Sequence, residues 1–349
     1  MDSPWAFPDF DEHELVHFVT DRKSGLKAVI AVHSSHLGPG AGGTRLWHYA
    51  RPGDAVADAL RLSRGMSYKN AMAGLPLGGG KAVILADKDR TKTPEMLVAF
   101  GQAVEGLCGR YVTAEDVGMN VADMVAISKQ TRFVAGLPVE SGAVGGDPGP
   151  HTSYGVFLGI KAAVKRALGK DSLAGLHLAI QGAGSVAGGV ARRAAEEGAR
   201  LSIADIDQDR VAALASETGA TVVDPDAIMT LEADLLSPNA LGAILTEESI
   251  AALRVPVVAG AANNQLATPA DGDRIHQRGI LYAPDYVINA GGIINVSTEY
   301  VRDGNETVVR DRIEKIPGRL EHIWDESVAT GRNPAAVADD MARRLIGRA

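Results

Sequence analysis

The sequence is poor in cysteine, because Cys108 is the only one among 349 residues. It therefore cannot form an intrachain disulfide, a cysteine zinc cluster or a CxxC redox pair, and this usage favours a cytoplasmic location. Basic charge is also in deficit, since 35 Lys and Arg stand against 43 Asp and Glu, a net charge of -8. Nucleic acids and anionic membranes attract basic surfaces, so we expect neither as a partner. A small-molecule partner is favoured, and we predict no metal.

Long apolar runs are missing as well, and none is long enough to span a bilayer. The first residues, MDSPWAFPDFDEHELV, are acidic and lack the basic and apolar regions of an export signal. Hydrophobic residues make up 46% of the chain and charged residues 22%, as in ordinary soluble globular proteins. A chain of 349 residues exceeds what one core usually supports, so two domains are expected.

The stretch MSYKNAMAGLPLGGGK, residues 66–81, places two lysines in apolar surroundings. Lys69 follows Met66 at helical spacing in a pattern that begins near Asp54, so it is predicted to point inward. Burial disfavours the charged ammonium and would make a base of either Lys69 or Lys81. The alternative is a surface turn whose lysines extend into water.

A hairpin is predicted before this stretch, from residues 14–21 and 26–34. The next segment, HLGPGAGGTR at residues 36–45, has too many glycines for a regular element and is predicted to be a loop. Gly42 and Gly43 could offer backbone N–H groups to a carboxylate there, although a tight turn is an equally valid interpretation.

Two strands are predicted to carry functional side chains, one directly after the three glycines that precede Lys81 and one later in the chain. KAVILAD starts a buried strand at Lys81, following a helix closed by Gly74. The later strand YVTAED delivers Asp116 to its carboxyl end, where α/β proteins commonly place functional side chains. A strand-end carboxylate can equally be an ordinary cap or ion-pair partner.

The strongest motif follows a glycine- and proline-rich segment at residues 141–150, which we interpret as the interdomain connection. Strand HLAIQ runs into Gly182-x-Gly184-x-x-Ala187, then a helix, then a strand ending at Asp205. This is the pattern of a dinucleotide-binding βαβ unit. Gly182 permits the tight turn, Gly184 lets a pyrophosphate meet the helix N-terminus, and Ala187 keeps helix and strand close.

Asp205 favours NAD over NADP, because a carboxylate here accepts hydrogen bonds from a ribose diol and repels a 2'-phosphate. Arg210 lies close enough in sequence to soften that repulsion. Strands then alternate with helices, as in a doubly wound parallel sheet, and Asn263 and Asn264 follow the strand VPVVAG on the nucleotide-binding side. Helices are predicted from Glu306 to about 330 and at 334–346.

Several segments together resemble one family. The segments LGPGAGGTR, GMSYKNAMAGLPLGGGK, TAEDVG, IQGAGSVAGG, GAANNQL and APDYVINAGGIINV are similar to the leucine/phenylalanine/valine branch of the amino-acid dehydrogenases related to glutamate dehydrogenase. The resemblance covers nearly the whole chain. It implies reversible oxidative deamination of an L-amino acid to a 2-oxo acid and ammonia, with NAD accepting the hydride, and a homo-oligomer.

The resemblance also implies roles for the residues that match these motifs. Lys69 would pair with the substrate carboxylate, with Gly42 and Gly43 helping to hold it. Lys81 would be the neutral lysine that activates water, and Asp116 the carboxylate that exchanges protons with the substrate. The implied cofactor and amine contacts are Gly182, Gly184, Ala187, Asp205, Asn263, Thr152 and Asn289, with Asn264 near the substrate amine.

Substrate choice follows from the side-chain pocket. Glutamate-specific relatives have a lysine where Ala41 stands and a serine where Val296 stands, and neither group is available here to hold a second carboxylate. Ala41 suits an aromatic side chain, whereas Ile293 is bulky for one. We therefore expect a hydrophobic L-amino acid, branched (Leu, Val, Ile) or aromatic (Phe, Trp). Glutamate dehydrogenase and a non-catalytic nucleotide-binding protein are the alternatives.

The expected architecture is α/β. Residues 1–140 form an α/β substrate domain, on which a C-terminal helix at 333–349 packs back. Residues 141–332 form a doubly wound Rossmann NAD-binding domain, and the active site lies in the cleft between the domains.

Overall fold

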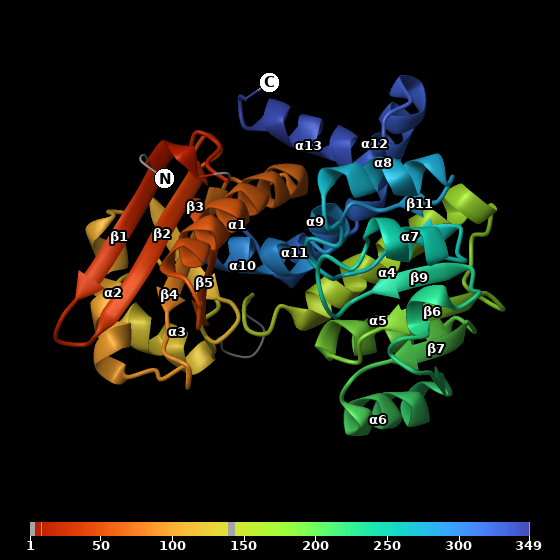
Figure 1. Ribbon diagram of the computed structural model, residues 1–349, viewed down its shortest axis with the longest axis horizontal. Helices are drawn as coiled ribbons and strands as arrows, with labels where there is room; N and C mark the ends of the chain where they lie inside the picture. Colours follow the sequence, from red (N-terminus) through yellow and green to blue (C-terminus); the bar gives the residue numbers. More distant parts are fainter. Residues whose placement is uncertain (1–3, 8, 139–143, 349) are drawn as a thin grey trace. The chain divides into compact units, whose positions relative to one another are not determined.

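The computed structural model describes residues 4–7, 9–138 and 144–348. Their contacts group into two compact units (Figure 1). The first comprises Met1–Asp147, Asn295–Val309 and Ala342–Ala349, and the second comprises Pro148–Ile294 and Arg310–Met341. The predicted boundary between residues 140 and 141, with the first part of the glycine-rich connection, lies outside the described residues.

The first unit contains a mixed five-stranded sheet in the order β1-β2-β4-β3-β5. β1 and β2 form the predicted antiparallel hairpin, β2 pairs antiparallel with β4, and β3 runs parallel to both β4 and β5. The parallel part brings the carboxyl ends of β3, β4 and β5 to one edge of the sheet. The strands are β1 (Leu15–Asp21), β2 (Leu26–Ser34), β3 (Gly40–Trp47), β4 (Gly78–Leu85) and β5 (Tyr111–Glu115).

Helices cover both faces of this sheet, and each face has its own core. The long helix α1 (Pro52–Ala73) packs on one face, where Ala59 and Leu60 meet Val83 of β4. It begins two residues before the predicted start and ends at Gly74, whose left-handed backbone caps it. Helices α2 (Pro94–Gly106) and α3 (Val121–Ser128) cover the other face, and the side chains of Thr93 and Asn120 cap their first turns.

The glycine-rich segment at residues 36–45 corrects one prediction, because much of it is strand β3 rather than a loop. A Cβ atom at Gly42 would lie 1.9 Å from the carbonyl oxygen of Gly80, so only glycine fits at this pairing. Similarly, Gly78–Gly80 belong to β4 instead of preceding it. A Cβ at Gly79 would lie 2.1 Å from the backbone nitrogen of Ser67 in α1, so the glycine allows helix and strand to touch.

The second unit is built on a six-stranded sheet in the order β11-β10-β9-β6-β7-β8, with every pair parallel. The order reverses beside β6, where such sheets bind nucleotides. The predicted doubly wound sheet is confirmed. Its strands are β6 (His177–Gln181), β7 (Arg200–Ala204), β8 (Thr221–Val222), β9 (Leu235–Pro238), β10 (Val257–Val258) and β11 (Leu281–Tyr282).

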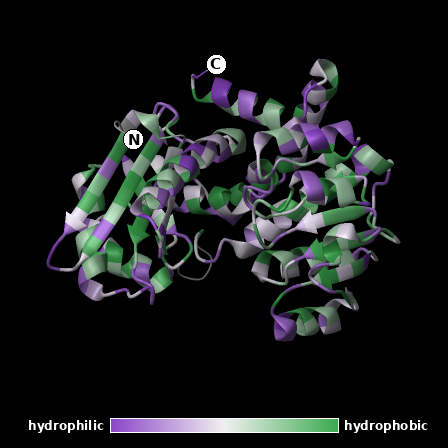
Figure 2. Cartoon of the chain, in the orientation of Figure 1, coloured by the Kyte–Doolittle hydropathy of each residue, from purple (hydrophilic) through white to green (hydrophobic). Residues whose placement is uncertain are grey.

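Helices surround this parallel sheet. The predicted helix from Glu306 to 330 is two helices, because Pro317 starts a new one and cannot supply the backbone N–H that continuation needs. Figure 2 shows amphipathic helices such as α13 in mixed purple and green, while strand β2 is mainly green. The helices from α4 onward are α4 (Gly149–Leu168), α5 (Ser185–Glu196), α6 (Gln208–Thr218), α7 (Glu247–Ala252), α8 (Pro269–Gln277), α9 (Asp285–Ile288), α10 (Gly291–Val301), α11 (Glu306–Ile313), α12 (Ile316–Thr330) and α13 (Pro334–Leu345).

Two short 3₁₀ helices, Pro4–Ala6 and Ile228–Thr230, complete the described elements. Trp324 of α12 is buried in the second unit and donates from its indole nitrogen to the carbonyl of Tyr282 at 3.0 Å. This bond ties α12 to the edge strand β11. Within the described residues, no helix is long and apolar enough to cross a membrane.

Candidate active site

Lys81 lies within β4, paired in register with Ala31 of β2, and its side chain is buried. Its Nζ is 2.8 Å from Oδ2 of Asp116. Burial lowers the pKa of Lys81 below its ordinary value, and the attraction of Asp116 opposes this without reversing it. Lys81, the lysine of the 66–81 stretch that lies in the sheet, therefore loses its proton more readily than an exposed lysine.

Asp116 follows the end of β5, as predicted, and faces two cations. Its Oδ2 contacts Nζ of Lys81 and accepts a hydrogen bond from Nε of Arg45 at 2.9 Å. Burial alone would raise the pKa of Asp116, but the charges of Lys81 and Arg45 outweigh it and hold that pKa below the ordinary value. Asp116 is thus a carboxylate at neutral pH.

Arg45 is a site residue that the sequence interpretation missed. It lies on β3 and donates from NH1 to Oδ2 of Asp58 in α1 at 2.8 Å, in addition to its bond with Asp116. The hydroxyl of Tyr49 donates to the same oxygen of Asp58 at 2.6 Å. A strand assignment for residues 40–47 would have revealed Arg45, because alternation places it on the face of Gly43.

Two of the predicted carboxylate-binding residues, Gly42 and Gly43, lie on β3 beside this cluster. A Cβ at Gly43 would lie 2.9 Å from Cβ of Asp116, so the Gly43 backbone runs directly beside that side chain. A Cβ at Gly42 would lie 3.1 Å from Cγ of Met66, which places α1 over β3. Lys69 is half-buried, one helical turn beyond Met66 on α1. The structure thus brings Gly42, Gly43 and Asp116 together, under the helix that carries Lys69.

The residues predicted to line the substrate side-chain pocket are apolar and at least half-buried. Ala41 is buried against Leu77 and Val112, and Tyr300 of α10 packs on these three. Val296 is half-buried one helical turn before Tyr300 on the same helix. Tyr300 was not singled out from the sequence, since only the fold brings α10 to this part of the sheet. Ile293, three residues before Val296, is also half-buried.

The glycine turn of the second unit has the geometry of a phosphate cradle. Gly182 has a φ of 98°, in the left-handed region, and Ala187 is buried against the sheet. Gly184 is the N-cap of α5, and in the described residues no side chain caps these first N–H groups. Oδ2 of Asp205 accepts the N–H of Ala183 at 2.6 Å, so the carboxylate lies beside the turn. These features fit a dinucleotide.

Amide side chains gather beyond β10. Nδ2 of Asn289 donates to Oδ1 of Asn263 at 2.8 Å and to the carbonyl of Ala261 at 2.9 Å. Its own Oδ1 is buried and has no partner within the described residues, as expected of a group that awaits a ligand donor. Asn264 is exposed, with a left-handed φ of 52°. Thr152, near the start of α4, donates from Oγ1 to the carbonyl of Pro148 at 2.9 Å.

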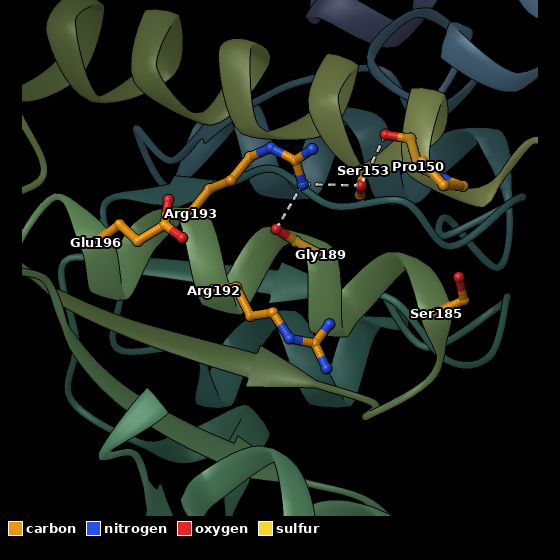
Figure 3. Close-up of a pocket in the computed structure, with 7 residues that line it drawn as sticks. All are labelled: Pro150, Ser153, Ser185, Gly189, Arg192, Arg193 and Glu196. Atoms are coloured by element: carbon orange, nitrogen blue, oxygen red, sulfur yellow. Dashed lines mark hydrogen bonds between the residues drawn. The ribbon is translucent and has the colours of Figure 1, made fainter. Parts of the chain in front are cut away.

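The second unit also has a cavity of about 410 Å³ between α4 and α5. Figure 3 shows Arg193 reaching from α5 to Ser153 and to the carbonyl of Gly189, with which it makes hydrogen bonds of 3.1 and 2.9 Å. None of the predicted catalytic or cofactor-binding residues lines this cavity. Its lining residues are Pro150, Ser153, Ser185, Gly189, Arg192, Arg193 and Glu196.

A parallel sheet with a dinucleotide turn, in one chain with a buried lysine bound to an aspartate that also binds an arginine, is the combination expected of an amino-acid dehydrogenase. Two family models match the chain. The Glu/Leu/Phe/Val dehydrogenase dimerisation domain matches residues 13–133, and the Glutamate/Leucine/Phenylalanine/Valine dehydrogenase domain matches residues 201–343. The chain belongs to the Glu/Leu/Phe/Val dehydrogenase family, which confirms the resemblance inferred from its motifs.

Similar proteins come from the same family. The chain is 48% identical to leucine dehydrogenase of Geobacillus stearothermophilus, over 96% of this chain and 91% of that protein. It is 44% identical to valine dehydrogenase of Streptomyces albus, over 97% and 93%. A crystal structure of L-tryptophan dehydrogenase from Nostoc punctiforme superposes with a TM-score of 0.83 at 39% identity, over 96% of each chain.

Proposed function

We propose that this enzyme catalyses NAD-dependent, reversible oxidative deamination of a hydrophobic L-amino acid. An amino acid, water and NAD⁺ give the 2-oxo acid, ammonium, NADH and a proton. The observation that carries the proposal is the buried Lys81 amine held against the Asp116 carboxylate, in the sheet that also carries Ala41. A lysine of lowered pKa beside an ionised aspartate is a base paired with a proton carrier.

Substrate binding is proposed for the residues around this pair. Lys69 and the backbone N–H groups at Gly42 and Gly43 would hold the α-carboxylate, so Lys69 has to remain an ammonium. Asn264 would face the substrate amine. With the carboxylate fixed and the amine toward Asp116, the Cα hydrogen has a single orientation, which is the main contribution of binding to catalysis.

Proton transfers are proposed for Asp116 and Lys81. Asp116 takes a proton from the substrate ammonium and leaves a neutral amine. Loss of the hydride from Cα then converts this amine to an imino acid. Neutral Lys81 then removes a proton from water as the water oxygen attacks the imine carbon. Asp116 returns its proton to the amine, and the C–N bond breaks as the hydroxyl of the intermediate gives its proton to the ionised Asp116, which releases ammonia and the 2-oxo acid. Asp116 and Lys81 then give up their protons, one to ammonia to form ammonium and one to water.

NAD is the proposed cofactor, and it supplies the hydride acceptor. Gly182, Gly184 and Ala187 would hold its pyrophosphate at α5, and Asp205 the adenosine ribose. Asn263, Asn289 and Thr152 would lie toward the nicotinamide. Arg210 forms an ion pair with Asp207 at 3.3 Å, which argues against its use as a 2'-phosphate ligand and supports NAD over NADP.

A hydrophobic substrate is proposed because Ala41, Val296 and Ile293 provide no polar group for a second carboxylate. Burying a carboxylate against them would carry a large desolvation penalty, which disfavours the glutamate dehydrogenase alternative. Relatives named leucine, valine and tryptophan dehydrogenases support both branched and aromatic candidates. The cluster of Lys81, Asp116 and Arg45 disfavours a non-catalytic protein, because a buried lysine held against an aspartate serves no purpose in nucleotide binding.

We also propose that the protein is a cytoplasmic homo-oligomer. The first family model is described as a dimerisation domain, which supports a homo-oligomer. The single cysteine and the acidic net charge support a cytoplasmic enzyme without nucleic-acid or membrane partners. The division into domains at 1–140 and 141–332, with helix 333–349 on the first, stays a proposal, as does the placement of the active site between them.

The experiment that tests this function is NADH formation at alkaline pH with Leu, Val, Ile, Phe, Trp and Glu as separate substrates. We expect turnover of one or more apolar amino acids and little or none of Glu. Faster turnover of Glu than of every apolar substrate would contradict the pocket argument. Repeating the best substrate with NADP tests Asp205, since equal kcat/KM for both cofactors would contradict its assigned selectivity.

A further inference from the structure

Four ionisable groups, basic and acidic in alternation, form a chain of contacts beside the proposed reaction centre. Lys81 contacts Asp116, Asp116 accepts from Arg45, and Arg45 donates to Asp58. They come from β4, the end of β5, β3 and α1, so the chain of contacts joins four elements of the first unit. With Lys81 neutral, as the proposed mechanism requires, Arg45 lies between two carboxylates, and Arg61, which donates to Oδ1 of Asp58, balances the second of them.

Arg45 uses the two ends of its guanidinium for different carboxylates. Nε binds Asp116 at 2.9 Å and NH1 binds Asp58 at 2.8 Å. Asp58 is itself held by the hydroxyl of Tyr49 at 2.6 Å and by NH2 of Arg61 at 2.8 Å. A planar guanidinium with both ends engaged has little freedom to rotate, and the point charge of a lysine could not make both bonds.

The contacts of Arg45 and Lys81 fall on the same oxygen of Asp116, Oδ2. We propose that Arg45 is a positioning residue that, anchored by Asp58, fixes Oδ2 of Asp116 toward Lys81 and thereby turns Oδ1 toward the substrate amine. The proposal rests on the deamination mechanism given above. It assigns Arg45 and Asp58 to the reaction without direct contact with substrate.

The charge of Arg45 also favours the protonation states of Asp116 and Lys81 that the proposed mechanism requires. It lowers the pKa of Asp116 and also that of Lys81, although burial is the larger cause for Lys81. Removing this cation would relieve repulsion of the Lys81 ammonium and so raise the pKa of Lys81. Arg45 thus keeps Asp116 ionised and helps Lys81 to lose its proton.

The experiment uses three variants of the full chain and one control. Arg45→Gln removes the positive charge. Arg45→Lys keeps the charge but loses the planar guanidinium that binds two carboxylates at once. Asp58→Asn removes the carboxylate that holds NH1 of Arg45. Arg51→Gln is the control, since Arg51 is exposed and pairs with Asp54 at the start of the same helix α1. The first readout is kcat/KM for the best amino acid as a function of pH.

The second readout does not need activity. Trace acetylation by acetic anhydride, followed lysine by lysine with mass spectrometry across a pH series, reports when the Lys81 amine loses its proton. In Arg45→Gln we expect the midpoint for Lys81 to rise by about one pH unit, with the acid limb of kcat/KM moving the same way. We expect kcat to fall by about 100-fold, because Asp116 is no longer held.

The other variants separate charge from position. Arg45→Lys should leave the midpoint near that of the native protein and still lose kcat by about 10-fold or more, as should Asp58→Asn. A purely structural role for Arg45 would lower resistance to urea in all three and leave the pH dependence unmoved. If Arg45→Gln does not fold, Arg45→Lys and Asp58→Asn carry the test of position.

Two failures are distinguishable. If the native enzyme deaminates no amino acid, the proposed function fails, while the acetylation curves still measure the effect of Arg45 on Lys81. If the native enzyme is active, and Arg45→Gln folds with unchanged kcat and an unchanged Lys81 midpoint, the positioning role of Arg45 is overturned.

Discussion

Single residues in this enzyme owe their character to what lies beside them. Lys69 and Lys81 are twelve positions apart in one stretch, yet Lys81 is buried in β4 against Asp116 while Lys69 is half-buried on α1. In the proposed mechanism Lys81 must lose its proton and Lys69 must keep one. The same side chain therefore serves as base or as cation, depending on its burial and partners.

Replacing Lys81 with alanine should abolish the chemistry and leave binding intact. We expect Lys81→Ala to lower kcat for deamination by about 10²- to 10⁴-fold, the usual contribution of a positioned base. An apolar 2-oxo acid should still protect the variant against thermal unfolding. Lys88→Ala, at an exposed site just past β4, is the matched control and should behave as the native enzyme. Native turnover in Lys81→Ala would remove Lys81 from the mechanism.

Tyr300 should set the size of the substrate side chain, because it packs on Ala41, Leu77 and Val112 at the apolar pocket. Removing its ring in Tyr300→Ala leaves space that only a large substrate fills. We expect the ratio of kcat/KM for Trp to that for Val to rise by about 10-fold. Tyr300→Phe keeps the ring and should leave this ratio close to native. Equal ratios in both variants would place the substrate side chain elsewhere.

At the scale of secondary-structure elements, local signals predicted the second unit well. The turn of Gly182 and Gly184, the helix after it and the strand before Asp205 form one continuous pattern of sequence, and the structure has these elements in that order. Their geometry depends on neighbours in the chain. The break at Pro317 was missed because proline is tolerated at the first turn of a helix, so it also allows a new helix to start.

Strand β3 shows where sequence was insufficient. Glycine has low strand propensity and no side chain to alternate, so residues 36–45 predicted a loop. Pairing with β4 and β5 and the approach of α1 decide the conformation instead, and these contacts come from distant segments. The same error concealed Arg45, since a residue in a loop has no assigned face. The predicted Lys81 and Asp116 are in contact, but their link to Asp58 required the fold.

The contact between α1 and β4 predicts opposite effects for two glycine substitutions. A Cβ at Gly79 would lie 2.1 Å from both the nitrogen and Oγ of Ser67, so Gly79→Ala must push α1 from the sheet. We expect it to cost about 1 to 3 kcal/mol of the free energy of unfolding. Gly65 lies within α1, where a Cβ would meet no atom within 4 Å. Gly65→Ala should stabilise the protein by about 0.5 to 1 kcal/mol.

Urea unfolding of the two glycine variants gives the comparison directly. The midpoint should fall for Gly79→Ala and rise for Gly65→Ala relative to the native chain. A midpoint for Gly79→Ala at or above the native value would mean that α1 and β4 are not in contact as described.

At the scale of the whole molecule, a buried polar cluster ties the end of the chain to its beginning. NH1 of Arg348 donates to Nε2 of His33 at 2.7 Å and to the carbonyl of Asp11 at 2.7 Å. NH2 donates to the carbonyl of Glu12 at 2.8 Å and to that of His33 at 2.6 Å. Nε2 of His33 also lies 3.2 Å from Oδ2 of Asp11. Arg348 can only donate, so in neutral His33 this nitrogen accepts from Arg348, and Nδ1–H donates to Ser67 at 2.8 Å.

This cluster predicts how stability depends on pH. Burial, followed by the charges of Arg348 and His13, lowers the pKa of His33 to about 3, while Asp11 acts in the opposite direction. The unfolded chain therefore binds a proton at His33 as the pH falls below about 6.5, whereas the folded chain does not. The contribution of His33 to stability is complete above that pH and is progressively lost between about 6.5 and 3.

Replacing His33 with glutamine should make the urea midpoint less sensitive to acid. Glutamine keeps a hydrogen-bond acceptor for Arg348 but cannot take up a proton, so the loss of stability on moving from pH 7 to pH 4.5 should be smaller than in the native protein. His17→Gln, on the neighbouring strand β1, is the control and should keep the native slope. Because one proton at one site changes the free energy of unfolding by at most about 1.4 kcal/mol per pH unit, the difference between the His33→Gln and native slopes should not exceed this limit. Parallel slopes for the two proteins would mean that His33 has the same pKa in the folded and unfolded chains, and would contradict a lowered pKa in this cluster.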